Sequence, residues 1–137
     1  MKNNLFYCDL SSNVEISYDK LKDDLVNIKS FNTCIDEQDY YSIFKKIILS
    51  LLLDKSIYLI DSEFSVLNKK QIINKYNKSI SVKDIDISSL NNLKIKKWSI
   101  TLFSSGTTGN PKQVSHNFDT ITRSVRKSEK HNNDIWG

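Results

Sequence analysis

The chain has 137 residues, of which 39% are hydrophobic and 26% charged, so it can form one compact core but is too short for two ordinary domains joined by a linker. An aromatic content of 10%, together with very few glycines and prolines, excludes disordered and collagen-like chains. Its 20 basic and 16 acidic residues give a net charge of +4, a mild excess that identifies no partner.

The first part of the chain predicts two helices and then a buried strand. Apolar residues at helical spacing within 17–28 predict a short amphipathic helix. A broader apolar stripe predicts a helix over 40–53 that packs on a core. A β-prone run at 56–60 follows, and Asp61 stops it, as expected for a buried strand. The stripe of the second helix consists of Tyr40, Ile43, Phe44, Ile47, Ile48, Leu51 and Leu52.

The middle of the chain has less regular patterns. Residues 65–76 have a few apolar positions at helical spacing, and Ser65 is available as the N-cap of a helix there. The pieces 80–82 and 85–87 are β-prone but lie in polar surroundings. We therefore expect a third helix and short strands whose pairing the sequence does not reveal.

The last part of the chain predicts a strand, a loop and a helix. The strand covers 98–103 and runs directly into a glycine-containing loop, and the helix is expected over 117–130. Because helices and strands alternate, the pattern favours an α/β fold with helices packed on a mixed sheet. No repeat or linker divides residues 1–137, which we interpret as one domain.

The loop after this strand has an unusual composition. The sequence has three glycines and one proline, and two of the glycines and the proline lie between Gly106 and Pro111. At average residue frequencies, this arrangement together with Lys112 arises by chance about once in 10⁵ starting positions. The arrangement therefore calls for a functional explanation.

Each residue type in this loop suits the binding of a polyphosphate. The two glycines allow positive φ and let successive backbone N–H groups approach an anion. The four hydroxyl side chains add donors, the proline restricts the loop, and the lysine supplies a positive charge. The candidate phosphate-binding residues are Ser104, Ser105, Gly106, Thr107, Thr108, Gly109 and Lys112.

The loop is not a Walker A motif, because two rather than four residues separate its glycines. Residues 104–112 instead match every position of a pattern of the adenylate-forming (AMP-binding) superfamily: hydroxyl, Ser, Gly, hydroxyl, Thr, Gly, any residue, Pro, Lys. The chain therefore resembles the N-terminal portion of acyl-CoA synthetase-like ligases. It departs from the family at Gln113, where glycine is usual. His116 matches a histidine of some members, whereas the more widespread family histidine corresponds to Phe118.

The resemblance implies an enzyme that joins a carboxylic acid to ATP, with Mg²⁺, and forms an acyl-adenylate and pyrophosphate. CoA, a carrier-protein thiol or another acceptor would then take the acyl group. It also implies that residues 1–137 are the N-terminal part of the large domain, a single incomplete domain. The resemblance places the catalytic lysine and the residues for adenine, ribose and magnesium beyond this chain. We therefore expect no catalytic residue, no metal ligand and no ligase activity in these residues alone.

Other interpretations stay open at this point. The loop could be a Gly-Thr-rich hairpin turn that matches the family by chance. The chain could also be a stand-alone nucleotide- or phosphate-binding module, or the missing remainder of the enzyme could be its partner. A basic group near the C-terminus could bind nucleic acid, although a solvated helix face is the more common explanation. This group consists of Arg123, Arg126, Lys127 and Lys130.

Several single residues also have ordinary explanations. His116 is a candidate site residue, but an exposed or helix-start histidine without a ligand is an equal alternative. Asp61 and Asp134 are interpreted as strand-end carboxylates rather than catalytic acids. Cys8 and Cys34 form neither a disulfide framework nor a zinc motif. With no secretory signal and no apolar run near the roughly 20 residues of a membrane span, we expect a cytoplasmic protein.

Overall fold

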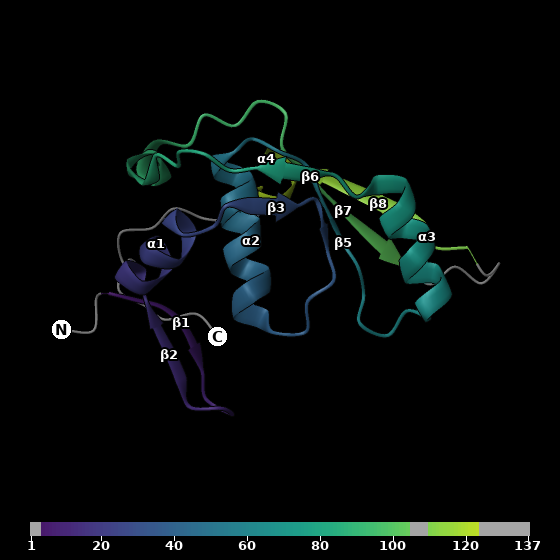
Figure 1. Ribbon diagram of the computed structural model, residues 1–137, viewed down its shortest axis with the longest axis horizontal. Coiled ribbons are helices and arrows are strands. Elements are labelled where there is room, and N and C mark those ends of the chain that lie inside the picture. Colours follow the sequence, from purple (N-terminus) through teal and green to yellow (C-terminus); the bar gives the residue numbers. More distant parts are fainter. Residues whose placement is uncertain (1–3, 105–109, 124–137) are drawn as a thin grey trace.

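The computed structural model describes residues 4–104 and 110–123. Its centre is a four-stranded mixed sheet in the order β4-β5-β7-β8 (Figure 1). The first three strands are parallel, and β8 pairs with β7 in antiparallel orientation. The prediction of an α/β fold with a mixed sheet is therefore confirmed. The strands are β4 (Cys34–Ile35), β5 (Ile57–Leu59), β7 (Ser99–Ser104) and β8 (Lys112–Asn117).

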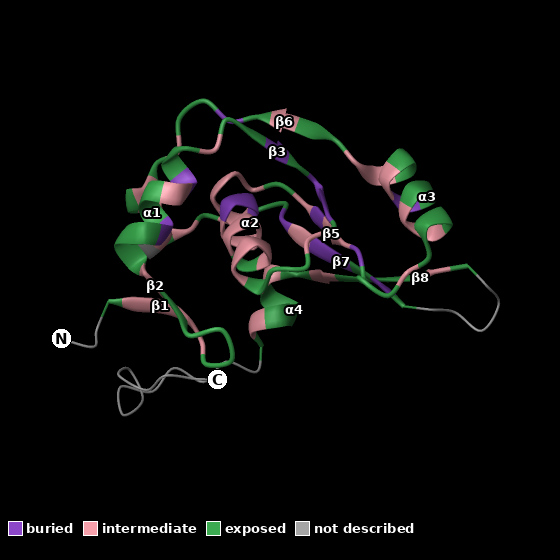
Figure 2. Ribbon diagram, turned by 60° about the horizontal axis from the view of Figure 1, so that its bottom comes forward, coloured by how far each residue is buried: buried purple, intermediate pink, exposed green. Residues whose placement is uncertain are grey.

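Helices α2 (Tyr40–Leu52) and α3 (Val66–Tyr76) cover opposite faces of this sheet. Alternate residues of a strand point to opposite faces, and the two apolar clusters follow that alternation. One cluster joins strand residues such as Ile57 and Ile100 to Leu49 of α2. The other cluster, on the α3 side, consists of Cys34, Ile60, Ile72 and Phe103. Figure 2 shows buried positions along β5 and β7, between the two helices.

The predicted helices start where a side chain caps the first turn. In α1 (Tyr18–Val26), the Lys20 N–H donates to Ser17 Oγ over 3.1 Å, and Asp39 and Ser65 accept equivalent bonds in α2 and α3. Each cap satisfies an N–H group that the helix itself leaves without a partner. Helix α4 (Phe118–Thr122) begins at the expected place. The remainder of the predicted helix at 117–130 lies largely outside the described residues, as does the strand start at 133–137.

Two small antiparallel pairs of strands accompany the main sheet: one packs near α1 and α2, and the other involves residues on either side of α3 and β5 in the chain. β1 (Leu5–Asp9) pairs with β2 (Val14–Ser17), and β3 (Ser30–Asn32) pairs with β6 (Ser79–Ser81). Of these strands, the sequence indicated only β6. Within the described residues, no helix is long and apolar enough to cross a membrane.

The prediction of a β-prone piece at 85–87 is wrong. A 3-10 helix, η1 (Ile87–Asn92), begins there instead. The Asp86 carboxylate accepts bonds from both the N–H and the hydroxyl of Ser88, which favours a turn over an extended strand. Ile85 and Ile87 still contribute to the fold, because both pack against the core cluster on the α2 side.

Asp54 links the end of α2 to the start of β7. It has a positive φ of 48° directly after the helix, a conformation that aspartate tolerates better than most residues. Its carboxylate accepts N–H bonds from Lys96, Lys97 and Trp98 at 2.9 to 3.2 Å. These bonds fix the entry of β7, the strand that leads into the loop at 105–109.

Candidate functional site at the carboxyl ends of the parallel strands

The carboxyl ends of β4, β5 and β7 meet at one edge of the sheet, because these strands are parallel. In open α/β sheets, ligands bind outside this edge. A cavity of about 410 Å³ lies there, between the edge and the first turn of α2. Ligand sites usually have volumes of about 300–1,000 Å³, so this cavity is large enough for a small organic molecule.

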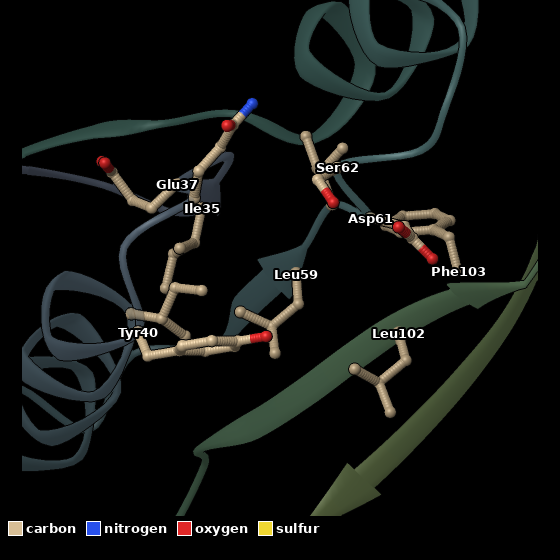
Figure 3. Close-up of a pocket in the computed structure, with 11 residues that line it drawn as sticks. Ile35, Glu37, Tyr40, Leu59, Asp61, Ser62, Leu102 and Phe103 are labelled. Atoms are coloured by element: carbon tan, nitrogen blue, oxygen red, sulfur yellow. The ribbon is translucent and has the colours of Figure 1, made fainter. Parts of the chain in front are cut away.

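The cavity has an apolar wall and a polar rim. The wall comes from the sheet face and from α2, and the rim comes from the residues that directly follow β4 and β5 (Figure 3). The Tyr40 side chain is 66% exposed, so its ring is available for contact. The apolar residues are Ile35, Tyr40, Ile43, Leu59, Ile60, Leu102 and Phe103. The polar residues are Glu37, Gln38, Asp61 and Ser62.

The acidic groups at this edge differ in their partners. Glu37 forms an ion pair with Lys46, and Asp36 forms one with Lys69 at 2.8 Å. The Asp61 carboxylate accepts the Glu63 N–H over 2.9 Å. Within residues 4–104 and 110–123, no cation pairs with Asp61. Asp61 therefore contributes an unneutralised, exposed carboxylate to the rim of the cavity.

Asp61 follows β5 at the same edge of the sheet at which β7 ends and the predicted phosphate loop begins. The parallel register of the two strands ends at Leu59 and Leu102, each two residues before Asp61 and Ser104. In Figure 3 the Asp61 carboxylate extends from the end of β5 toward Phe103, at the end of β7. The strand-end carboxylate and the first loop residue thus belong to the same edge.

The two described ends of the loop lie opposite each other in a β-hairpin. Ser104, the last residue of β7, pairs with Lys112, the first residue of β8. Two residues earlier, Leu102 pairs with Val114, and residues two apart share a face of a sheet. Because Leu102 lines the cavity, Ser104 and Lys112 also lie on the cavity side of the sheet. The predicted site residues Ser105, Gly106, Thr107, Thr108 and Gly109 lie outside the described residues.

Gln113 has a definite role at the position where the resembled family has glycine. Its side-chain amide donates to the Tyr76 hydroxyl of α3, across the sheet face opposite the cavity. The Tyr76 ring also stacks on Tyr58, with 4.8 Å between ring centroids. The departure from the family pattern therefore ties the exit of the loop to the second helix layer, away from the cavity.

His116 lies in β8, beyond the described end of the loop at Lys112. His116 is half-buried in β8, where it pairs with Ile100. It lies four residues beyond Lys112, which corresponds to about 13 Å along an extended strand. It also precedes Asn117, the N-cap of α4, so it is neither a loop residue nor a helix-start residue. Whether His116 contacts a ligand of the loop stays a prediction.

The sequence located the loop, but it did not reveal the cavity or that Asp61 lines the cavity. The available signal was that both convincing strands, 56–60 and 98–103, are followed at once by polar residues. If the two strands are parallel neighbours, those residues must lie at the same edge of the sheet.

Of the basic group near the C-terminus, Arg123 is exposed at the end of α4. The other three members, and Asp134, lie outside the described residues.

Comparisons with known proteins do not identify a family for this chain. It matches no protein-family model, no curated protein and no solved structure.

Proposed function

We propose that this chain forms the ATP phosphate-binding part of an acyl-adenylate-forming ligase. The position of the two described ends of the loop supports the proposal most strongly. Ser104 and Lys112 are cross-strand neighbours at the edge of the mixed sheet where the parallel strands end, on the side where the cavity opens. The loop between them has the glycines and hydroxyls that suit a polyphosphate.

The proposed role is to bind the phosphates of ATP and to stabilise pyrophosphate as it departs. A carboxylate substrate attacks the α-phosphate, and negative charge develops on the leaving β- and γ-phosphates. The Lys112 ammonium and the Ser104 hydroxyl would donate hydrogen bonds to those oxygens, and the loop residues at 105–109 are expected to add N–H and hydroxyl donors. Donors held in place before the reaction stabilise the developing charge without reorganising.

Other parts of the reaction have no assigned residues in this chain. The part of the chain that the structure describes contains no group of three or more His, Cys, Asp or Glu side chains that could hold a metal ion. Mg²⁺ is commonly bound through phosphate oxygens and water with one or two carboxylates. The resemblance places the catalytic lysine and the sites for the acid and its thiol acceptor outside these 137 residues.

Pyrophosphate binding to Lys112→Ala tests the proposal, with Lys94→Ala as the matched control. Lys94 is also an exposed lysine, but it precedes β7, at the opposite end of the strand from the loop. Removing a charge-assisted hydrogen bond should weaken binding about tenfold in the Lys112 variant and little in the control. Equal binding by both variants, measured by calorimetry, would contradict the assignment of Lys112.

A second measurement separates this function from nucleic-acid binding. Gly106→Val introduces a bulky side chain into the loop and should abolish pyrophosphate binding while leaving the circular dichroism spectrum unchanged. Binding to DNA or RNA that weakens steeply with salt and is indifferent to this substitution would instead favour a basic nucleic-acid-binding protein.

A further inference from the structure

The cavity at the carboxyl ends of the parallel strands has acidic side chains in its lining but no basic ones. The chain as a whole has 20 basic and 16 acidic residues. None of the 11 described residues that line the cavity is a lysine, arginine or histidine, whereas Glu37 and Asp61 are acids. Such a lining attracts a cation unless groups of the protein already neutralise its carboxylates.

The carboxylates in the segment 35–40, beside the cavity, all have partners. Glu37 and Asp36 each form an ion pair with a lysine. Asp39 caps α2, because its side chain accepts the Ser42 N–H over 2.8 Å. This carboxylate lies at the positive end of the helix dipole. The first turn of α2 therefore already has an anion of the protein at its end and does not call for an anionic ligand.

Asp61 is the lining acid whose charge is not balanced. Its carboxylate accepts the Glu63 N–H over 2.9 Å, and no cation pairs with it within residues 4–104 and 110–123. Ser62, the next residue, adds a hydroxyl to the same rim. A protonated primary amine has three N–H donors and one positive charge, so it can donate to the carboxylate and to the hydroxyl at once.

The opposite side of the cavity is apolar. Figure 3 shows Tyr40 across the cavity from Asp61. The Tyr40 side chain is 66% exposed, and Ile43 and Leu59 extend the apolar surface of the cavity. An aromatic ring placed there can stack on the tyrosine and removes apolar surface from water. Because the apolar and the charged sides are apart, the ligand needs a spacer between its ring and its cation.

We propose that this cavity binds an arylalkylamine, a primary amine joined to an aromatic ring by a short alkyl chain. The ammonium donates to Asp61 and Ser62, and the ring packs against Tyr40 and Leu59. The inference goes beyond the proposed function and does not depend on it, because it uses none of the residues 104–112.

Other ligand classes match only one side of the cavity. A carboxylic acid would place a second negative charge beside Asp61. An inorganic cation would bind the carboxylate but leave the apolar wall in contact with water, and a neutral aromatic molecule would leave the carboxylate without a cation. A primary alkylamine has a pKa of about 10, like lysine, so an arylalkylamine is charged at pH 7 and matches both sides.

The test compares ligands of similar shape and different charge, by calorimetry with the full 137-residue chain at pH 7. The cation is 3-phenylpropylamine, the neutral analogue is 3-phenylpropanol and the anion is 3-phenylpropionate. The amine should bind about fivefold more tightly than the alcohol, since an exposed ion pair contributes little more than that, and the anion should bind most weakly. Equal binding of amine and alcohol, or tighter binding of the anion, would overturn the proposal.

Propylamine, which lacks the ring, tests the apolar side of the cavity. It should bind about tenfold more weakly than 3-phenylpropylamine, because it leaves the apolar wall in contact with water. Equal binding of these two amines would show that the chain attracts cations without using the cavity, and it would overturn the proposal.

Two substitutions assign the charge preference to one carboxylate. Asp61→Asn keeps the shape of the side chain without its charge and should remove the preference for the amine over the alcohol. Glu63→Gln is the matched control and should keep it, because Glu63 is an exposed acid two residues away that does not line the cavity. A preference that persists in Asp61→Asn, or disappears in both variants, would contradict the role of Asp61.

Tyr40→Ala tests the position of the ring. It should weaken 3-phenylpropylamine and 3-phenylpropanol by the same factor, about threefold, because the ring contacts the tyrosine in both ligands. No change for either ligand would contradict the placement of the ring at Tyr40. Circular dichroism spectra that match the unsubstituted chain would show that each variant is folded, and the ligand series on that chain tests the proposal without any variant.

Discussion

Replacing Ser50 by alanine should destabilise the protein by leaving one buried indole N–H without a partner. Ser50 is fully buried on α2, and its hydroxyl accepts the Trp98 Nε1–H over 2.8 Å. Trp98 is only 3% exposed, directly before β7. The same Ser50 hydroxyl donates to the carbonyl oxygen of Ile47 over 2.6 Å. The substitution therefore breaks the hydrogen bond that joins the helix to the beginning of the loop-bearing strand.

The expected loss follows from the contacts. A buried donor left unsatisfied costs about 1–3 kcal/mol. Alanine has a helix propensity about 0.5 kcal/mol better than serine, which offsets part of that loss. The net change in the free energy of unfolding should be about 1.5 kcal/mol. At about 2.1 cal/mol/K per residue, a chain of 137 residues has an unfolding entropy of about 0.29 kcal/mol/K, so Tm should fall by about 5 °C.

A double-mutant cycle isolates the hydrogen bond from the other effects. In a Trp98→Phe background no indole N–H is present, so Ser50→Ala should cost nothing there or stabilise slightly. The expected coupling energy is about 1.5 kcal/mol, measured by urea unfolding followed by far-ultraviolet circular dichroism with an unchanged m-value. Equal destabilisation by Ser50→Ala in both backgrounds would refute the reasoning, as would no destabilisation in the original chain.

Two further predictions concern Asp54 and Cys34. Burial of Asp54 raises the pKa of its carboxyl, but hydrogen bonds from the N–H groups of residues 96–98 outweigh burial, and the net pKa is lowered. The resulting stability is fully present above the ordinary pKa of 3.8 and is lost as the pH falls through the lower folded-state pKa. Urea titrations of Asp54→Ala should therefore show a smaller loss of stability on acidification than the original chain. Burial raises the pKa of the Cys34 thiol from 9.0 to about 11, a difference of 11 − 9 = 2 units, so its thiolate fraction at pH 8 falls about hundredfold. Iodoacetamide labelling followed by mass spectrometry should therefore modify Cys34 much more slowly in the folded chain than in urea, and equal rates would contradict the packing around it.

The sequence predicted the helices well because local interactions determine where they start. The predicted cap at Ser65 accepts the Asn68 N–H in the structure, and the predicted helix at 40–53 corresponds to α2 within one residue. A cap and an apolar stripe both lie within the segment that they define. These signals need no knowledge of the rest of the fold.

Two of the strands that the sequence missed, β3 and β4, depend on partners distant in the chain. β3 pairs with β6, about fifty residues away, and β4 is only two residues long. Such short segments carry too few residues for an alternating pattern to be visible. The wrong expectation at 85–87 has the same origin, because a β-prone composition could not reveal that Asp86 caps a 3-10 turn.

For the candidate site, too, only the part formed by residues close together in the sequence could be predicted. The loop at 104–112 was visible because its glycines, proline and hydroxyls are contiguous. The cavity was not, because its walls come from α2 and three strands and meet only in the folded chain. Asp61 illustrates the difference, since in the sequence it is an ordinary strand-end carboxylate. In the structure it lies on the rim of a cavity, together with residues from α2 and the other strands.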